Sequence, residues 1–434
     1  MPGLHQEHAP GVRLRVLVVG GGLSGMASAL ALRQAGHDVI VFERMPELKE
    51  IGAGIQLPPN ATRLLERWGV LDEVRKHAFQ PETGALRSHE GAVISRSPPG
   101  AVVERIYKVP FLVIHRADLL NVLKDAAVKH GVEIKLGCEV ACINFSQPSL
   151  QLATGAVHDA DVILGADGER SFCRTALLGR PDPPASTGDV VVRIAVARSD
   201  IAEGHPSWEL MQRASVNVWM GPGAHGVSYL LKDDILNVVL VHADDKPDQN
   251  REIMPGPQRA DLDELKALFS GWDPALRGLL EVGESDCTMW TSMQINEVTN
   301  WSHSGGRFVL TGDAAHAILP YLAQGAAQAF EDAGAIGAIF ERLADRSQAD
   351  DALRVFEQVR RPRAAEVRKR TLAQKAMYGL CRGPAQEERD AKLSLGPVAG
   401  SPNALADPIF QGWLWGYDAA KVGSEAWEAH IKGQ

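Results

Sequence analysis

The stretch RLRVLVVGGGLSGMASALALRQAGHDVIVFER, residues 13–44, decides the fold class of this chain. Its first part, Arg13 to Val19, is rich in valine and leucine, which favours a buried parallel strand. The Ala- and Leu-rich run from Leu23 to Gln34 predicts a helix that ends before Gly36. His37 to Phe42 predicts a second strand. Together these elements predict a βαβ unit of about 30 residues.

The turn of this unit has the spacing Gly20-x-Gly22-x-x-Gly25, which is typical of dinucleotide binding. The first glycine permits the turn, the second lets a diphosphate lie against the backbone, and the third lets helix and strand pack closely. The start of the helix adds free N–H groups and a positive dipole, and Glu43 would accept hydrogen bonds from the adenosine ribose. We therefore expect seven residues of this unit to bind the cofactor: Gly20, Gly22, Leu23, Ser24, Gly25, Glu43 and Arg44. The motif does not distinguish NAD from FAD.

Composition excludes several classes of protein. The 434 residues are 45% hydrophobic and 23% charged, which is typical of a globular chain with a large core. The net charge of -9 leaves no global basic field, so nucleic acid is not an expected partner. No apolar run of about 18 residues is present, the N-terminal MPGLHQEHAPGVRLR lacks the apolar core of a secretion signal, and the five cysteines lack C-x-x-C spacing. We therefore expect a cytoplasmic protein without a transmembrane segment or a metal site.

The α/β pattern continues to about residue 180, and the composition changes after RPDPPASTGD. Short strand-like runs between Val190 and His242 then predict a mostly antiparallel sheet. The strand-and-helix pattern returns at Arg307. We therefore expect an α/β fold in which a Rossmann-like FAD-binding domain of the glutathione reductase type is interleaved with this sheet and followed by C-terminal helices. The expected boundaries are 12–82, 109–185 and 290–348 for the FAD-binding domain, 83–108 and 186–289 for the substrate domain, and 349–434 for the helical region.

One long polar helix is expected from Asp350 to Lys375. Glu357 and Glu366 alternate along it with seven cations, which favours a solvated helix face over an anion-binding role. The cations are Arg354, Arg360, Arg361, Arg363, Arg368, Lys369 and Arg370.

Two later motifs follow predicted strands, Asp167-Gly168 in DVILGADGERSFCR and Gly312-Asp313 in VLTGDAAHAILP. With the N-terminal glycine motif they occur in the order and spacing of a known family. Over nearly its whole length the chain resembles the single-component FAD-dependent aromatic hydroxylases, the family of p-hydroxybenzoate, salicylate and 6-hydroxynicotinate hydroxylases. The resemblance implies that Asp167 belongs to a motif tied to FAD and NAD(P)H, and that Asp313 contacts the flavin ribityl chain.

Further cofactor residues follow from this resemblance. The segment GAGIQLPPNA, which contains Gly54, resembles the one beside the isoalloxazine ring, and Arg116 resembles an arginine that contacts the diphosphate side. A forked, permanent cation suits a diphosphate, although a surface ion pair is the alternative for Arg116. Backbone N–H groups at Gly325 and Ala326 could face the pyrimidine edge of the flavin. The chain has Ala-Gln-Gly-Ala where many relatives have a further glycine, which leaves the shape of this loop open.

The substrate residues are less determined. The two-residue strand period places His225, Val227, Tyr229 and Leu231 on one face. The resemblance makes His225, Tyr229 and His316 the candidate catalytic residues, because one of them would hydrogen-bond or deprotonate a substrate hydroxyl. A buried histidine and tyrosine in the sheet core is the equal alternative. Gln56 stands where related enzymes have a histidine. Gln294, Trp301 and Tyr321 are further pocket candidates, for which a core role is favoured.

The resemblance implies an FAD-dependent monooxygenase that uses NADH or NADPH and O2. It would hydroxylate an aromatic or heteroaromatic hydroxy acid through a C4a-hydroperoxyflavin, with loss of the carboxylate left open. One alternative is an epoxidase or dearomatising oxygenase of a secondary-metabolite pathway. The non-enzyme alternative is a carrier of prenylated proteins on the same fold. The expected partners are a small aromatic substrate and O2, and a homodimer is left open.

Overall fold

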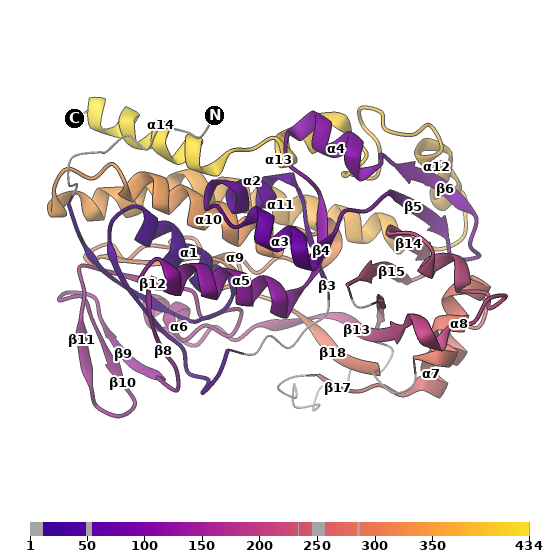
Figure 1. The fold of residues 1–434 in the computed structure, drawn as a ribbon, viewed down its shortest axis with the longest axis horizontal. Helices are drawn as coiled ribbons and strands as arrows, with labels where there is room; N and C mark the ends of the chain where they lie inside the picture. Colours follow the sequence, from indigo (N-terminus) through magenta and orange to yellow (C-terminus); the bar gives the residue numbers. More distant parts are fainter. Residues whose placement is uncertain (1–11, 49–53, 233, 245–256, 284–286, 434) are drawn as a thin grey trace.

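The first layer of the protein is a five-stranded parallel sheet (Figure 1). The computed structural model describes residues 12–48, 54–232, 234–244, 257–283 and 287–433. The sheet order is β19-β12-β1-β2-β8. Its strands are β1 (Arg15–Val19), β2 (Asp38–Phe42), β8 (Glu133–Lys135), β12 (Val162–Gly165) and β19 (Phe308–Leu310). All pairings described in this sheet are parallel, and β12 and β19 are buried throughout, as expected for a sheet covered on both faces.

Helices pack around this sheet. Helix α1 (Leu23–Gln34) has the bounds that the sequence predicts, and α10 (Gly325–Phe340) packs closely against it. A Cβ atom at Gly337 would lie 2.9 Å from the Cβ of Ala31, so the glycine permits the close approach. Helix α10 is buried from Ala327 onward, which is typical of a core helix. The other helices of this part are α2 (Pro59–Arg67), α3 (Leu71–His77), α5 (Arg116–Lys129), α6 (Phe172–Leu178) and α9 (Asp313–His316).

The second layer is an eight-stranded sheet in the order β17-β18-β13-β16-β15-β14-β5-β6. Its strands are β5 (Thr83–Ser88), β6 (Val93–Ser97), β13 (Ala185–Ala197), β14 (Ser215–Gly221), β15 (Ala224–Leu231), β16 (Ile235–Ala243), β17 (Gln258–Arg259) and β18 (Cys287–Gln294). Only β14 and β5 pair in parallel among the described strands of this sheet, so the prediction of a mostly antiparallel sheet is confirmed. The expected boundary at residue 290 falls inside β18.

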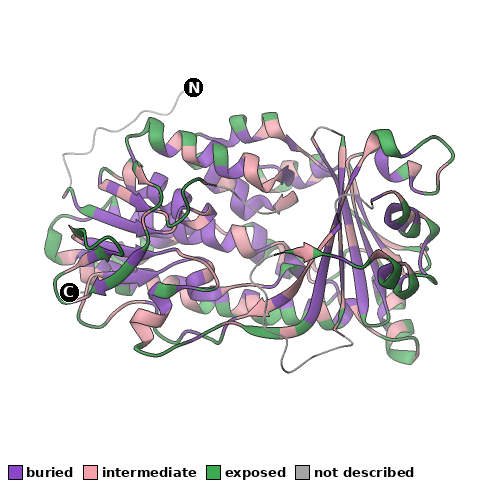
Figure 2. Cartoon of the chain, turned by 90° about the horizontal axis from the view of Figure 1, so that it is seen from below, coloured by how far each residue is buried: buried purple, intermediate pink, exposed green. Residues whose placement is uncertain are grey.

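The two faces of the large sheet have different neighbours. Helices α7 (Leu262–Leu268) and α8 (Pro274–Val282) cover one face, where Val192 and Ile194 pack in a cluster with Leu276. Val191 points to the opposite face and lines a cavity, because side chains alternate along a strand. Figure 2 shows the strands buried along their length and the outer sides of the neighbouring helices exposed.

Two three-stranded sheets complete the strands of the described chain. The first joins β3 (Gly54–Leu57), β7 (Leu112–His115) and β4 (Ala78–Phe79), and the second joins β9 (Val140–Asn144), β10 (Ser149–Leu152) and β11 (Val157–Asp159). Val113 of β7 forms an apolar cluster with Tyr229 and Leu231 of β15. Leu112 and Ile114 of β7 belong to the core that surrounds the five-stranded sheet, so the first small sheet connects the two larger ones.

The C-terminal region is helical, as the sequence predicts. It contains α11 (Ala349–Tyr378), α12 (Pro384–Leu393), α13 (Pro408–Trp415) and α14 (Ala419–Lys432). Figure 1 shows α11 running along much of the length of the molecule. The sequence did not predict α7, α8 or α4 (Gly100–Tyr107). Only Gly100 and Val103 of α4 are buried, so its sequence carries little apolar periodicity. The first residues of the GAGIQL segment lie outside the described residues.

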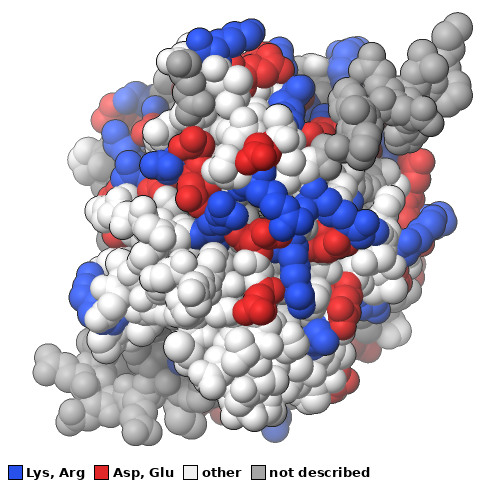
Figure 3. All heavy atoms as spheres, turned by 90° about the vertical axis from the view of Figure 1, so that its left-hand side faces the viewer, with Lys and Arg blue, Asp and Glu red and all other residues white. Residues whose placement is uncertain are grey.

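Charged side chains at one end of the molecule are mixed in sign. Figure 3 shows lysines and arginines gathered there with acidic residues between them. This face therefore does not present a continuous basic surface. Within the described ranges, no helix is long and apolar enough to span a membrane, and no cluster of His, Cys, Asp and Glu is placed to hold a metal ion.

Candidate active site

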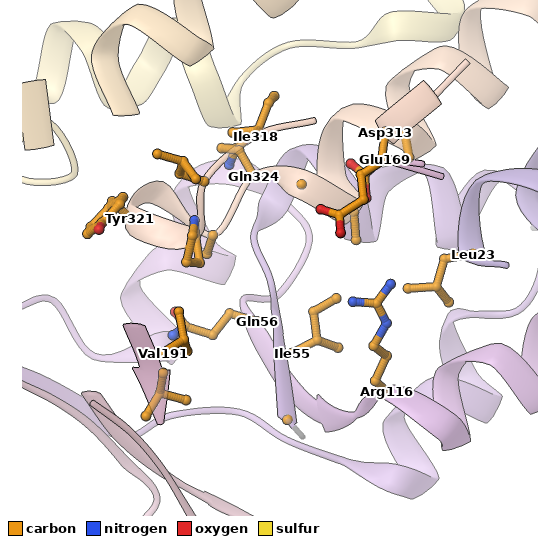
Figure 4. Close-up of a pocket in the computed structure, with 18 of the residues that line it drawn as sticks. Leu23, Ile55, Gln56, Arg116, Glu169, Val191, Asp313, Ile318, Tyr321 and Gln324 are labelled. Atoms are coloured by element: carbon orange, nitrogen blue, oxygen red, sulfur yellow. The ribbon is translucent and has the colours of Figure 1, made fainter. Parts of the chain in front are cut away.

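A cavity of about 850 Å³ extends from the glycine turn after β1 to the large sheet. It reaches the face of the sheet that α7 and α8 do not cover. This volume lies within the range of ~300–1,000 Å³ that is usual for ligand sites. We call its two parts the glycine end, formed at the ends of β1, β2, β12 and β19, and the sheet end, formed by the large sheet and residues 318–323. Gly325 and Ala326, at the start of α10, also line the cavity and are counted in neither part. Figure 4 shows Arg116, Glu169 and Asp313 on one side of the view and Val191 and Tyr321 on the other.

The glycine turn is shaped by close backbone contacts. Gly20 has a φ of +106°, and a Cβ atom there would lie 2.4 Å from the carbonyl oxygen of Ala166. A Cβ atom at Gly25 would lie 1.9 Å from the carbonyl oxygen of Gly20. Helix α1 begins at Leu23 and its N-cap residue, Gly22, makes no side-chain cap. The first N–H groups of the helix are therefore available to an anion.

The carboxylate of Glu43 is held at the end of β2. Its Oε2 accepts a hydrogen bond of 2.7 Å from the Gly21 N–H, and its Oε1 accepts one of 2.8 Å from the Met45 N–H. Both Glu43 and the exposed Arg44 line the cavity. The acid thus stands beside the glycine turn, as the sequence predicts for a residue that contacts a ribose.

Three charged side chains face one another further along the glycine end. Arg116 is the first residue of α5, and Figure 4 shows its guanidinium group pointing into the cavity with Glu169 and Asp313 opposite. Burial and the nearby charge of Asp313 raise the pKa of Glu169. The cation and the two acids surround the path between the glycine turn and the sheet end. Sequence reasoning did not select Glu169, because no general rule assigns the residue after Asp-Gly.

Asp167 has a second role besides lining the cavity. Its carboxylate accepts hydrogen bonds from the Ser171 hydroxyl and, at 3.0 Å, from the Cys173 N–H, so it fixes the start of α6. The fully buried Arg174 of that helix binds Asp182 at 2.9 Å and the carbonyl oxygen of Ala314 at 3.2 Å. The Asp-Gly and Gly-Asp segments are thereby tied together through one arginine.

The Gly312 turn lies directly against the start of α1. Its φ is +60°, and a Cβ atom there would lie 2.5 Å from the Ser24 hydroxyl oxygen. That hydroxyl is hydrogen-bonded to the hydroxyl of Thr311 at 2.8 Å. The N–H of Gly312 donates to Asp332 at 2.9 Å. The two cofactor motifs, nearly 300 residues apart, therefore form one continuous wall.

A buried ion cluster supports this wall from behind. It consists of Glu331 and Asp332 of α10, Arg360 and Arg363 of α11, and His316. Arg360 binds Glu331 at 2.6 Å and Asp332 at 2.8 Å. Burial opposes the ionisation of Asp332, but His316 and Arg360 outweigh it and lower the pKa of Asp332. Because every cation here faces an acid, the charges can remain buried.

This ion cluster corrects the interpretation of α11 as a solvated face. Arg360 is completely buried and Arg363 is 6% exposed. Arg363 donates a bidentate pair of hydrogen bonds to the carboxylate of Glu331, at 2.6 and 2.8 Å. Its guanidinium carbon also lies 3.6 Å from the centre of the Tyr417 ring. Arg361, which follows Arg360, is on the exposed side and lies 3.8 Å from Glu357. The prediction was wrong because sequence charge alternation does not reveal acids on another helix.

The sheet end is lined chiefly by aliphatic side chains. Six valines reach the cavity from four neighbouring strands, namely Val191, Val216, Val218, Val227, Val239 and Val241. The C-terminal region closes this end with residues that sequence reasoning missed, namely Tyr378, Asn403, Leu405, Gln411 and Trp415. Among the described lining residues, the lysines and arginines are Arg44, Arg116 and Arg170, which all lie at the glycine end. The sheet end is therefore suited to an aromatic ring.

His225 and Tyr229 lie on the cavity face of β15, as the two-residue period predicts. Burial lowers the pKa of His225 to about 4; the charge of Asp189 opposes this shift and that of Lys375 adds to it. Burial also raises the pKa of Tyr229 well above its ordinary value. At neutral pH the histidine is therefore uncharged and the tyrosine is protonated, so both are hydrogen-bonding groups. The Tyr229 ring also packs on Gly54, where a Cβ atom would lie 2.4 Å from it.

The structure brings most of the sequence-selected residues to this cavity. Those that line it are Gly20, Gly22, Leu23, Ser24, Glu43, Arg44, Gly54, Arg116, Asp167, Asp313, Gly325, Ala326, His225 and Tyr229. Gly25 lies behind the turn. His316 does not line the cavity, because its ring is bound to Asp332 at 2.6 Å. Of the three further pocket candidates, Tyr321 lines the cavity, Trp301 is in the core, and Gln294 is outside the lining.

These residues fit a flavin dinucleotide. The glycine turn offers a cradle that a Cβ atom at Gly20 would fill, and Glu43 stands where the adenosine ribose would lie. Arg116 supplies a cation on the diphosphate side, and Gly325 and Ala326 supply the start of α10 beyond it. The long cavity joins these groups. The ribose, the diphosphate and the flavin ring of an extended dinucleotide would therefore each meet a matching group.

Comparisons with known proteins agree with this geometry. A family described as "FAD binding domain" matches residues 13–371. The FAD-dependent monooxygenase OpS4 of Beauveria bassiana (strain ARSEF 2860) is 36% identical over 95% of this chain and 97% of its own length. The 3-amino-4-hydroxybenzoate 2-monooxygenase PtnB3 of Streptomyces platensis is 34% identical over 95% of this chain and 98% of its own. A salicylate hydroxylase substrate complex superposes with a TM-score of 0.79 and 26% identity over 95% of this chain and 98% of that one.

Proposed function

We propose, because this chain belongs to the family of FAD-dependent aromatic hydroxylases, that it hydroxylates an aromatic or heteroaromatic hydroxy acid bound at the sheet end. The chain is a flavoprotein monooxygenase with FAD as its cofactor, and NAD(P)H is the reductant typical of the family. The alternative of a prenyl-protein carrier has no support in these relatives, which are named monooxygenases.

One observation carries the proposal: a single cavity joins a dinucleotide-binding turn to a valine-lined sheet. Bound FAD, reduced by the nicotinamide nucleotide, supplies the activation of O2, and one oxygen atom enters the ring while the other becomes water. The glycine turn and Arg116 would hold the diphosphate. Backbone N–H groups at the start of α10 would stabilise negative charge on the flavin ring.

The sheet end would bind the substrate and keep water away from it. Its valines exclude water from the reacting atoms, which limits wasteful loss of the activated oxygen. Tyr229, protonated at neutral pH, donates a hydrogen bond to an oxygen of the substrate, and the uncharged His225 offers one donor and one acceptor. A substrate carboxylate would be met by such neutral donors, since the described lysines and arginines that line the cavity lie at the glycine end.

The test is reconstitution followed by turnover. The purified protein is incubated with FAD, and NADH and NADPH oxidation is measured over a panel of phenolic acids and their neutral phenols. We expect a flavin absorption spectrum, oxidation stimulated by some phenols, and a hydroxylated product in amounts matching the nicotinamide consumed. Release of carbon dioxide would show that hydroxylation removes the carboxylate. An epoxide product would show that the enzyme is the alternative epoxidase and not a hydroxylase. A protein that cannot take up FAD contradicts the proposal.

A further inference from the structure

The hydroxyl of Tyr321 is hydrogen-bonded to Asp189, an acidic residue that does not line the cavity. Tyr321 lies in the 3-10 helix η4 (Pro320–Leu322) and lines the cavity, whereas Asp189 of β13 does not. The tyrosine hydroxyl donates to Oδ2 of Asp189 at 2.9 Å. The ammonium group of Lys375, on α11, lies against the same oxygen. One carboxylate thus joins the loop after the Gly-Asp motif, the large sheet and the C-terminal helix.

The direction of this hydrogen bond is fixed by charge. Burial and the nearby carboxylate of Asp189 raise the pKa of Tyr321, so the hydroxyl keeps its proton and donates it to Asp189, which is 8% exposed. A hydroxyl group has one proton and two lone pairs. With its proton held by Asp189, Tyr321 can offer only lone pairs to anything else. A group bound beside it must therefore be a hydrogen-bond donor.

The neighbours of Tyr321 place this acceptor in the sheet end. The ring of His225 lies 5.1 Å from that of Tyr321 and 5.3 Å from that of Tyr378, measured between centroids. All three side chains line the cavity. Asp189 also occupies the same face of β13 as the cavity-lining Val191, two residues further along the strand. Figure 4 shows Tyr321 and Val191 on the side away from Arg116.

We propose that Tyr321, oriented by Asp189, is the hydrogen-bond acceptor for a hydroxyl or amino group on the aromatic substrate. Tyr321 then determines specificity by contact, and Asp189 is a positioning residue that acts through it. A substrate with an ether oxygen at this point meets two acceptors and no proton, and leaves a buried polar group unpaired. The inference rests on the proposed function, since it requires an aromatic ligand at the sheet end.

A purely structural reading of the same contacts is that Asp189 fastens β13 to α11. The two readings differ in what each side chain does. If Asp189 only fastens the sheet to the helix, removal of Lys375 should resemble removal of Asp189. If Asp189 orients Tyr321, removal of Lys375 leaves the tyrosine–carboxylate bond in place and preserves ligand preference.

The experiment measures ligand binding without turnover. Protein reconstituted with FAD, without nicotinamide, is titrated with 3-hydroxybenzoate and 3-methoxybenzoate, and with phenol and anisole, while the flavin absorption spectrum is followed. In the wild type we expect each hydroxyl compound to bind at least about 10-fold more tightly than its methyl ether. Thermal unfolding of each variant is recorded in parallel.

Four variants separate the explanations. Tyr321→Phe keeps the ring and removes the acceptor, so the preference should fall to within about 2-fold. Asp189→Leu frees the tyrosine proton for the ether oxygen and should also abolish the preference. Lys375→Met and Tyr378→Phe should keep the wild-type ratio. The Tyr378 change is the matched control, because it removes a hydroxyl from the same wall.

The outcomes are distinguishable. A preference that survives Tyr321→Phe comes from ligand size and overturns the assignment, even if phenols bind and stimulate NADH oxidation. If the preference for the hydroxyl compound is lost in Tyr378→Phe but kept in Tyr321→Phe, the acceptor is Tyr378 and the assignment to Tyr321 is wrong. A loss in Lys375→Met equal to that in Asp189→Leu favours the fastening reading. If no compound perturbs the flavin spectrum of the reconstituted protein, the proposed function fails together with the inference.

Discussion

The two ends of the cavity are built from different parts of the polypeptide. At the glycine end, the binding surface is formed mainly by backbone. Gly20 and Gly25 have no room for side chains, and α1 begins there with free N–H groups. At the sheet end, the binding surface is formed mainly by side chains that neighbouring strands contribute. A ligand common to a whole family can be held by backbone. A ligand that differs between relatives must be recognised by side chains.

Charge divides the two ends in the same way. The cations Arg44, Arg116 and Arg170 gather at the glycine end, where a diphosphate would lie. The sheet end combines valines with groups that are uncharged at neutral pH, because burial lowers the pKa of His225 to about 4 and raises that of Tyr229. Variants at the two ends should therefore affect different ligands.

Replacing Gly20 with valine should have the largest effect. The new side chain would strike the carbonyl oxygen of Ala166, and a β-branched residue strongly disfavours a φ of +106°. We expect FAD affinity, measured by flavin fluorescence titration, to fall by at least about 1,000-fold, or about 4 kcal/mol. Gly36→Ala is the matched control, since Gly36 has a φ of +97° with open space around it. It should cost about 1–2 kcal/mol of folding stability and leave FAD affinity within about 2-fold. Equal loss of FAD in both variants would show that strain, and not the cradle, is responsible.

Replacing Arg360 with methionine tests what supports the glycine end. The change leaves Glu331 and Asp332 without a buried cation that contacts both, so we expect the free energy of unfolding to fall by about 3–5 kcal/mol. Urea denaturation measures this. Arg361→Met, at the neighbouring position, where the side chain is 42% exposed, should cost less than about 0.5 kcal/mol. Similar small losses in both variants would mean that the ion cluster contributes no net stability.

Replacing His225 with asparagine should change the pH dependence of stability. The unfolded histidine binds a proton below its ordinary pKa of about 6.5, whereas the folded one resists protonation down to about pH 4. Acid therefore favours unfolding, and between pH 7 and pH 5 this residue should cost the wild type about 2 kcal/mol of stability. The variant should lack that part of the loss in denaturant titrations at the two pH values. His130→Gln, at an exposed position, should keep the wild-type slope. An unchanged slope in the His225 variant would contradict the burial of a neutral imidazole.

Replacing Val239 with alanine should have the smallest effect on stability and none on the cofactor. Val239 lines the cavity, so its loss should cost about 1 kcal/mol, keep FAD affinity within about 2-fold, and tighten binding of bulkier alkylphenols by about 5-fold. Val238 is the matched control, because it is fully buried on the opposite face of the same strand. Val238→Ala should cost about 2–3 kcal/mol without altering ligand preference. A change in FAD affinity in the Val239 variant would show that the two ends are not separate.

The contrast between the ends also explains what could be predicted from the sequence. The bounds of α1 and the glycine turn were predicted because they depend on residues within one βαβ unit. The strand period likewise placed His225 and Tyr229 on the cavity face. These features need only local spacing. They account for six of the twelve cofactor candidates that line the cavity, and the resemblance to a known family supplied the other six.

Features that depend on distant partners could not be predicted. Arg360 can be buried because Glu331 and Asp332 lie on another helix, 29 and 28 residues earlier in the chain. His316 was a catalytic candidate, but its ring binds Asp332 behind the cavity wall. Trp415 reaches the cavity from the C-terminal helices, and nothing in its local sequence indicates that position. Each of these placements is a product of tertiary packing.

The most direct test is a crystal structure of the protein reconstituted with FAD and a bound phenol. The adenosine should lie beside Glu43, the flavin ring should lie near Gly325 and Ala326, and the phenol should contact the valines and Tyr321 of the sheet end. A flavin bound with its ring system at Glu43, or a phenol bound at the glycine end, would contradict the division of the cavity into a cofactor half and a substrate half.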